Sequence, residues 1–320
     1  MDLEGKIVFS AGQSDCFDIW VMDFASKALT QLTKGEFSCD SPKWSPDGSK
    51  IAYISNEAGT SELWTMNEDG SDKLRLAYAD QHLSTPTWAA DGSRLLFCAQ
   101  CGNMGEIGVW SIHIEGSAPP EILFSFPGTP THPCWSADGK RVLFSAPSKN
   151  ECSIWEYLID LNQWKRLTSG GFEDFAPVYS PEEDMIAFIS SRSPQSKSAV
   201  LDYGIWLMAG DGTSLRRVSH DEGEENHVSW SPDGRYLVYC AAYPDSTRER
   251  LKIVDLVHDN KNTLKFDREL IKQASSYEDY SGFHQSHSLM FSQGLESNAL
   301  HDMQYGNTYI GTERYPDWKY

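Results

Sequence analysis

One motif recurs along this chain about every 45 residues, and it constrains the fold more than any other feature. Its clearest copies read SPKWSPDGSKIAYIS from residue 41, TPTWAADGSRLLFCA from residue 85 and HPCWSADGKRVLFSA from residue 132. Looser copies begin at Pro177 and His227. A second apolar run follows each copy, such as LWTM from Leu63 or IWLM from Ile205, and then a short basic and apolar stretch. The repeating unit therefore contains several short apolar segments separated by turns.

The residue pattern within each unit is typical of four short strands. Alternating or fully apolar runs indicate strands, and Asp followed by Gly supplies the side-chain hydrogen bond and the positive φ of a tight turn. Four-stranded units at this period predict an all-β fold, a β-propeller of four-stranded antiparallel blades. The aromatic residue of the first strand is found seven times, at Trp44, Trp88, Trp135, Tyr179, Trp230, Phe283 and Trp318. Seven blades are therefore expected.

The two ends of the chain are predicted to complete one blade between them. The chain begins with a second strand, KIVFS from Lys6, and ends with a first strand, RYPDWKY from Arg314 to Tyr320. We expect the C-terminal strand to pair beside KIVFS, because closing the ring removes two free sheet edges. Six blades are the alternative if residues 268–312 form an irregular insertion, although the LHDM run at Leu300 favours seven. Residues 1–320 are then expected to form a single propeller domain.

Neither a membrane span nor a signal peptide is expected. The apolar runs are shorter than the roughly 18 residues that a span requires, and the N-terminus lacks a charged segment followed by an apolar one. Seven cysteines are present, and the pair Cys98 and Cys101 has no second pair that would complete a zinc site. Reduced thiols favour the cytoplasm, and a periplasmic protein whose leader has been removed is the alternative.

Charge and motifs exclude several classes of function. The chain has 27 Lys and Arg residues against 46 Asp and Glu residues, a net charge of −19. Since no basic cluster is present, nucleic acid and anionic membranes are poor partners. The sequence contains no Gly-x-Ser-x-Gly nucleophile elbow, no phosphate-binding loop, no dinucleotide fingerprint and no HExxH helix. Serine hydrolysis and nucleotide-dependent chemistry are therefore not expected.

The segment SPKWSPDGSKIAYISNEAGTSELWTMNEDGSDKLRLA resembles the repeat of TolB-like β-propellers, in which Pro-x-Trp-Ser-Pro-Asp-Gly leads into the later strands. The resemblance covers nearly the whole chain. It is specific for the fold rather than for function, because such repeats also build the propellers of prolyl-oligopeptidase relatives and of oligogalacturonate lyases. It implies a non-enzymatic, monomeric scaffold without a cofactor that binds a protein or a small polar or carbohydrate ligand. The long loop from Ser190 to Gly204 is expected to depart from a minimal ring.

In a propeller, the residues just before each innermost strand converge on the mouth of the central channel, where a ligand is expected to bind. Read back from each first-strand aromatic residue, these positions are polar and mostly acidic. The predicted ligand-binding residues are Asp40, His132, Asp174, Glu225, His227, Glu278, Asp279, Arg314 and Tyr315, with Ser84, Thr85 and Phe175 beside them. A ring of solvated loops is the alternative interpretation, since turns are polar in any case.

His132 and His227 each precede the aromatic residue of their strand by three positions. Similar segments supply the catalytic and metal-binding histidines of oligogalacturonate lyases, so the resemblance implies a metal-dependent polysaccharide lyase, acting by β-elimination, as the alternative function. His132 would then be the base, and Glu225 and His227 would hold a divalent cation such as Mn²⁺ or Ca²⁺. The sequence departs from the lyases at Ala176, where another ligand would be expected. The remaining histidines considered are expected to be structural or superficial: His113, His258, His284, His287 and His301.

Overall fold

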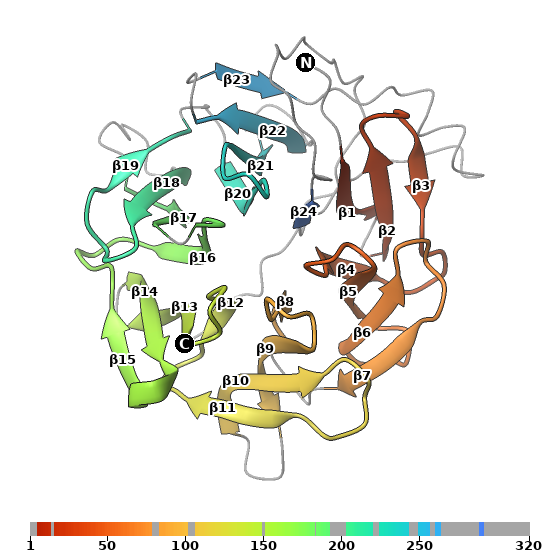
Figure 1. The fold of residues 1–320 in the computed structure, drawn as a ribbon, viewed down its shortest axis with the longest axis horizontal. Coiled ribbons are helices and arrows are strands. Elements are labelled where there is room, and N and C mark those ends of the chain that lie inside the picture. The colour runs from red at the N-terminus through yellow and green to blue at the C-terminus, as the bar shows by residue number, and fades with distance from the viewer. Residues whose placement is uncertain are drawn as a thin grey trace.

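The computed structural model describes residues 5–13, 16–78, 83–101, 106–148, 151–182, 184–192, 203–219, 224–242, 249–256, 260–263 and 288–290. These residues form a ring of six four-stranded antiparallel sheets, the blades of a β-propeller (Figure 1). The prediction of an all-β propeller with four-stranded antiparallel blades is confirmed. Within the described residues, no helix is long and apolar enough to cross a membrane.

Each blade runs from an innermost strand at the channel to an outer strand at the circumference. The innermost strands of blades 1 to 6 are β24 (Ser288–Met290), β4 (Cys39–Trp44), β8 (Thr87–Trp88), β12 (Thr131–Trp135), β16 (Asp174–Tyr179) and β20 (Glu224–Trp230). The second strands are β1 (Lys6–Gln13), β5 (Lys50–Ser55), β9 (Arg94–Cys101), β13 (Arg141–Ser148), β17 (Met185–Ser190) and β21 (Tyr236–Ala242).

The two outer positions of each blade complete the sheets. The third strands are β2 (Cys16–Asp23), β6 (Glu62–Asn67), β10 (Glu106–His113), β14 (Glu151–Leu158), β18 (Gly204–Ala209) and β22 (Glu249–Asp255). The outer strands are β3 (Leu29–Gln31), β7 (Leu74–Tyr78), β11 (Glu121–Ser125), β15 (Gln163–Arg166), β19 (Arg216–Arg217) and β23 (Asn260–Thr263). A short 3-10 turn, η1 (Ile159–Leu161), joins β14 to β15.

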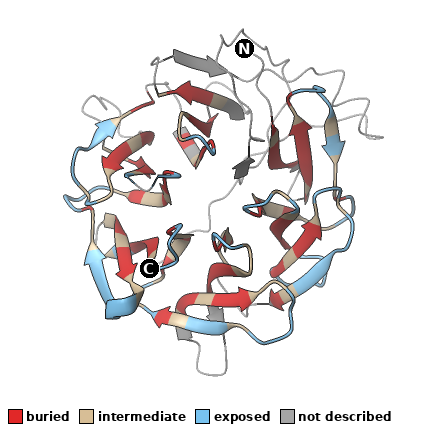
Figure 2. Cartoon of the chain, viewed as in Figure 1, coloured by how far each residue is buried: buried red, intermediate tan, exposed pale blue. Residues whose placement is uncertain are grey.

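The core is built from one aromatic residue of every second strand. These residues are at most 2% exposed, and they are Phe9, Tyr53, Phe97, Phe144, Phe188 and Tyr239. In blades 1 to 5 the residue directly opposite on the third strand is a tryptophan, and in blade 6 it is Lys252. Aromatic pairs of this kind are the main unit of side-chain stabilisation across a sheet. Figure 2 shows the burial concentrated in these middle strands, with exposed residues on the outer strands.

Two other parts of the repeat have visible structural roles. In the SPDG turn after β4, Asp47 accepts hydrogen bonds from the Oγ of Ser45 at 2.6 Å and the backbone N–H of Ser49 at 3.0 Å, which fixes the turn. After three outer strands, a hydroxyl accepts a hydrogen bond from a third-strand N–H: Thr33 from Ile19 at 2.8 Å, Thr168 from Ile154 at 3.0 Å and Ser219 from Ile205 at 2.7 Å. The basic and apolar stretch of each repeat therefore ties the outer edge of its blade to the sheet.

Two tryptophans of the innermost strands also join neighbouring blades. Trp88 Nε1 donates to the backbone oxygen of Lys43 at 2.9 Å, and Trp230 Nε1 donates to that of Val178 at 3.2 Å. Buried Trp side chains commonly find such a partner for the indole N–H. Cys16, Cys39, Cys98, Cys134, Cys152 and Cys240 are free thiols, and Cys39, Cys98 and Cys240 are buried.

The closing strand is not the predicted one, and the blade count of seven is corrected to six. β24 pairs antiparallel with β1, placing Met290 opposite Lys6, Leu289 opposite Ile7 and Ser288 opposite Val8. The first blade thus takes three strands from the N-terminal part of the chain and one from beyond residue 287. The predicted closing strand from Arg314 to Tyr320 and the LHDM run lie outside the described residues.

The wrong prediction of seven blades has a simple physical origin. The run SLMFS from Ser288 has the alternation of a second strand and follows Phe283, the first-strand aromatic residue of the expected extra blade, but a first and a second strand share the same two-residue period. Only the pairing partner distinguishes them. Because the edge of β1 needs a strand for the ring to close, Ser288–Met290 becomes the innermost strand of blade 1.

Truncation tests the closing strand directly. A chain ending at residue 287 loses β24 and exposes the edge of β1, so we expect its Tm to fall by about 5 °C or more, from several net backbone hydrogen bonds of about 1 kcal/mol each. A chain ending at residue 293 keeps β24 and should melt within about 2 °C of the full chain. Thermal unfolding followed by circular dichroism provides the measurement. An equal loss in both truncations would place the closing strand after residue 293.

Candidate functional site

Four innermost strands contain the same irregularity, and it shapes the channel wall. The register with the second strand shifts between Asp40 and Lys43, Thr131 and Cys134, Phe175 and Val178, and Asn226 and Ser229. At each place two residues face a single residue of the partner strand, which defines a β-bulge. The first of the two has a positive φ, and these residues are Ser41 at 54°, His132 at 51°, Ala176 at 51° and His227 at 55°.

The sequence explains where the bulge forms. The second bulge residue is Pro42, Pro133 or Pro177 in three of the blades and Val228 in blade 6. Proline has no N–H for the ladder, so a position without a ladder bond suits it. A positive φ is uncommon for residues other than glycine, and such backbone strain recurs at ligand-binding sites. The bulged positions of the innermost strands are therefore candidates for a ligand-binding site.

A cavity of about 250 Å³ lies between the innermost strands of blades 2 to 6. In Figure 1 these strands surround the centre of the ring. The cavity is lined by Lys43, Trp44, Pro46, Thr85, Pro86, Thr87, Trp88, His132, Pro133, Cys134, Ala176, Pro177, Val178, His227, Val228 and Ser229. The lining thus includes two of the predicted site residues, His132 and His227, with the small Ala176 at the same position of the blade between them.

His132 is the polar side chain with the least satisfied surroundings in this wall. Its Nδ1 atom is buried and has no hydrogen-bond partner in the described part of the chain. Its ring lies against Phe175 of the next blade, with the centroids 6.3 Å apart and the planes tilted by 44°. Burial and, after it, the positive charge of Lys43 lower the pKa of the imidazole from 6.5 to about 4. His132 is therefore neutral at physiological pH, with one nitrogen able to donate and one able to accept.

Lys43 is a cavity residue that the sequence analysis missed. Burial lowers the pKa of its ammonium group from 10.5 to about 8, with the Cys134 thiol acting in the opposite direction. A sequence signal for it does exist. The residue directly before the first-strand aromatic lines the cavity in each of these five blades: Lys43, Thr87, Cys134, Val178 and Ser229.

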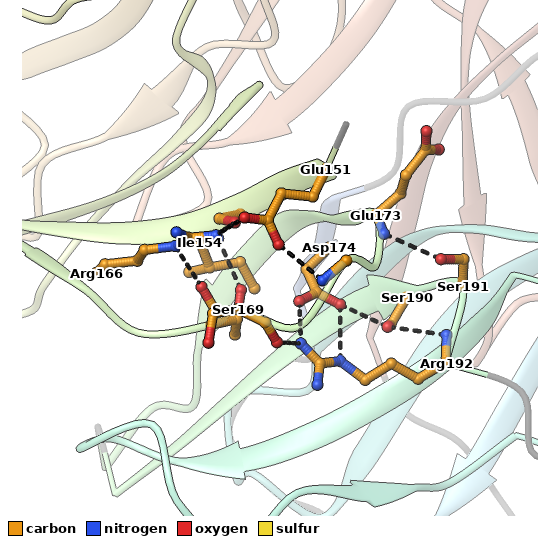
Figure 3. Close-up of polar contacts among 12 residues, drawn as sticks. Glu151, Ile154, Arg166, Ser169, Glu173, Asp174, Ser190, Ser191 and Arg192 are labelled. Carbon is orange, nitrogen blue, oxygen red and sulfur yellow. Dashed lines mark hydrogen bonds and ion pairs between the residues drawn. The ribbon is translucent and has the colours of Figure 1, made fainter. Parts of the chain in front are cut away.

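The carboxylate of Asp174, which was predicted to bind a ligand, instead joins two strands of blade 5. It is 1% exposed and is held by Arg192, whose Nε donates to Oδ1 at 3.0 Å and whose Nη2 forms an ion pair with Oδ2. Ser190 Oγ donates to the same carboxylate at 2.5 Å (Figure 3). The Arg192 guanidinium also stacks 4.6 Å from the centre of the Phe172 ring. Asp174 thus fastens the end of β17 to the start of β16 and does not line the cavity.

Glu225 and Asp40 also form hydrogen bonds within the protein. Glu225 is fully buried, and its Oε2 accepts hydrogen bonds from the Ile205 N–H at 3.0 Å and from Ser219 Oγ. Burial raises the pKa of the Asp40 carboxyl, and a hydrogen bond with the Ser41 side chain opposes that effect. Neither residue belongs to the cavity lining.

The remaining predicted positions line the cavity, form a hydrogen bond within the protein or lie outside the described residues. Thr85 lines the cavity, whereas Ser84 Oγ accepts a hydrogen bond from the Cys98 N–H at 2.9 Å. Glu278, Asp279, Arg314 and Tyr315 lie outside the described residues, as do residues 193–202 of the long loop.

A divalent cation does not fit the donors that the structure describes. No group of three or more His, Cys, Asp or Glu side chains is arranged to hold a metal ion among the described residues. Of the two ligands expected under the lyase hypothesis, His227 lines the cavity, but Glu225 is bonded to Ile205 and Ser219 instead. Hard divalent cations prefer several oxygen ligands, which this wall does not present.

Comparison with known proteins identifies the repeats. The profile described as the TolB beta propeller domain matches residues 4–119 and 113–269. The chain is similar to TolB from Acinetobacter baumannii, with a TM-score of 0.67 and 19% identity, over 82% of this chain and 63% of that one. It is also similar to an oligogalacturonate lyase solved in complex with manganese, with a TM-score of 0.51 and 16% identity, over 82% of this chain and 74% of that one. At these identities the likeness concerns the fold.

One curated relative is an oligogalacturonide lyase from Pectobacterium atrosepticum, 31% identical over 83 residues. That match covers 25% of this chain and 21% of the lyase. The chain therefore matches about a fifth of the length of this relative, which identifies shared repeats and not a shared activity.

Removing the Asp174 carboxylate should affect stability rather than binding. Asp174→Ala leaves the Arg192 guanidinium, whose side chain is 12% exposed, without its carboxylate, so we expect unfolding free energy to fall by about 3 kcal/mol or more. Urea unfolding gives this value. The matched control is Asp160→Ala, an exposed carboxylate on η1, which should stay within about 0.5 kcal/mol of the parent. Normal stability with altered ligand binding would instead return Asp174 to the site.

The buried imidazole predicts a dependence of stability on pH. The unfolded chain binds a proton on His132 near pH 6.5 and the folded chain only near pH 4, so protonation between these values favours the unfolded state. Stability should therefore decrease as the pH falls through this window. His132→Asn, which tolerates a positive φ, should lose less stability than the parent between pH 7 and pH 5. Identical pH dependence in urea unfolding of the two proteins would contradict the burial of this imidazole.

Proposed function

This chain belongs to the TolB β-propeller family, and we propose that it is a non-enzymatic binding propeller whose central channel takes up a small polar ligand. The observation that carries the proposal is the cavity between the innermost strands, in whose wall His132 and His227 are both held at bulge positions with positive φ. Concave sites with a few converging polar groups on an otherwise apolar wall are the usual form of a small-molecule site.

The composition of the wall supports this choice. Prolines, the two tryptophans Trp44 and Trp88, and Val178 supply apolar surface, whereas the two histidines, Lys43 and Ser229 supply groups able to form hydrogen bonds. A volume of about 250 Å³ corresponds to roughly eight water molecules at about 30 Å³ each. That size suits a small molecule better than a folded partner, which would need a contact area of about 800 Å² per side. A protein partner would have to use the loops instead.

Paired substitutions test this assignment. His132→Ala combined with His227→Ala should abolish binding of any small polar compound found by thermal-shift and calorimetric screening of the parent protein. Stability should change little, since Ala176 already occupies the equivalent bulge position with the same φ. The matched control is His113→Ala at the end of β10, which should bind as the parent does.

The outcomes separate the possibilities. A double variant that binds a screened compound as tightly as the parent overturns the assignment of the channel. Absence of binding to the parent by every compound also overturns it. A double variant with a strongly lowered Tm would give the histidines a structural role in the channel wall.

A polysaccharide lyase is the second candidate, favoured by His132, whose unpartnered Nδ1 lies in the wall of a cavity, and by the partial match to the Pectobacterium lyase. In that reaction a neutral imidazole removes the proton next to a uronate carboxylate, the bond to the β oxygen breaks, and a double bond forms. Polygalacturonate is the substrate to use, with the absorbance of the unsaturated product as the measurement. Activity that disappears in His132→Ala would favour the lyase, and no new absorbance in the parent would remove it.

A further inference from the structure

We propose that the cavity recognises the carboxylate of a small organic acid, with Lys43 as its cationic partner and His132 as a hydrogen-bond donor. The inference rests on the proposed function, because it names the chemical class of ligand for the same cavity. It reverses the expectation drawn from the sequence, in which the predicted site was a mainly acidic ring.

The sign of the charge on the cavity wall is the first argument. Among the described residues that line the cavity, Lys43 carries a positive charge, His132 and His227 add imidazole groups, and none is Asp or Glu. The chain as a whole has a net charge of −19. A basic wall inside so acidic a chain is not expected from composition, so its sign is a property of the site.

The nearby carboxylates do not make the charge of the cavity wall negative. Asp174 forms its ion pair with Arg192 inside blade 5, and Glu225 accepts hydrogen bonds from Ile205 and Ser219. Burial raises the pKa of Asp40, which disfavours its charged form. Each of the three predicted carboxylates that the structure describes therefore has partners within the protein or a pKa that favours its neutral form, and none of them lines the cavity.

The two named groups complement a carboxylate. Lys43 and His132 lie close enough for the charge of one to lower the pKa of the other, although they belong to different blades. Burial lowers the pKa of Lys43 to about 8, so its ammonium form still predominates at pH 7, and an anion beside it would favour that form. The imidazole tautomer with hydrogen on Nδ1 would donate to the second oxygen, giving the buried Nδ1 the partner that it lacks among the described residues.

A carboxylate fits better than a phosphate. A phosphate carries up to two negative charges and is generally bound by several N–H donors or by arginines. Among the described residues, this wall offers one lysine and two histidines and no arginine. One negative charge against one ammonium group leaves the occupied cavity close to neutral.

Matched pairs of probes test the charge requirement. Gluconate and sorbitol differ mainly in one carboxylate, as do succinamate and succinamide, and inorganic phosphate provides the second anion. Calorimetric titration of the parent protein should show at least tenfold tighter binding of the carboxylate member of a pair, and weaker binding of phosphate. Lys43→Met should remove the preference, and Lys43→Arg should keep it. Both changes leave intact the backbone oxygen that accepts the Trp88 hydrogen bond.

Lys165→Met on the outer strand β15 is the matched control and should keep the full preference. Equal binding of the neutral and acidic members, still dependent on His132, would overturn this inference while leaving the proposed function intact. A preference that persists in Lys43→Met would overturn it as well, and so would a preference for phosphate. If none of the probes binds to the parent while neutral compounds from the screen do, the inference fails alone. If nothing at all binds, the proposed function fails with it.

Discussion

Each blade depends on a cross-strand contact between the aromatic residue of its second strand and the residue opposite it on the third. In five blades that opposite residue is tryptophan, as in the pairs Phe9 with Trp20 and Phe188 with Trp206. These middle strands are buried on both faces only when a blade stands on each side, so no blade can be stable alone. The ring must close, and the short pairing of β24 with β1 completes it.

The rigid middle of each blade allows irregular backbone at the centre. A residue other than glycine with a φ near 50° costs free energy, and it persists where the surrounding structure determines the conformation. Here the second strand holds both ends of each bulge in register, for example Thr131 opposite Ser145 and Cys134 opposite Leu143. The bulge residues His132 and His227 consequently line the cavity, at positions which a regular strand would not provide.

The distribution of charge follows from the same geometry. Acidic residues at the starts of the innermost strands find partners on nearby strands. Ser190 and Arg192, at and after the end of β17, satisfy Asp174, and the Ile205 N–H of β18 in the neighbouring blade satisfies Glu225. Their burial is tolerated because they are paired. The residues one position before the aromatic face the cavity instead, and Lys43 is the charged one among them. A chain that is acidic overall thus encloses a basic cavity.

The sequence by itself determined the four-stranded blade as the repeating unit of the fold. Its apolar alternation and its Asp-Gly turns are local features, and the turns form through neighbours a few residues away, as the turn at Asp47 does with Ser45 and Ser49. It also identified His132 and His227 as positions near the channel, because each precedes the first-strand aromatic residue by three positions. Only the tertiary structure decided the number of blades, since a first and a second strand have the same pattern and differ in their partner. It also decided which polar residues line the cavity. Asp174 and Lys43 are equally polar in sequence, but whether a partner such as Arg192 lies within reach depends on how distant strands pair.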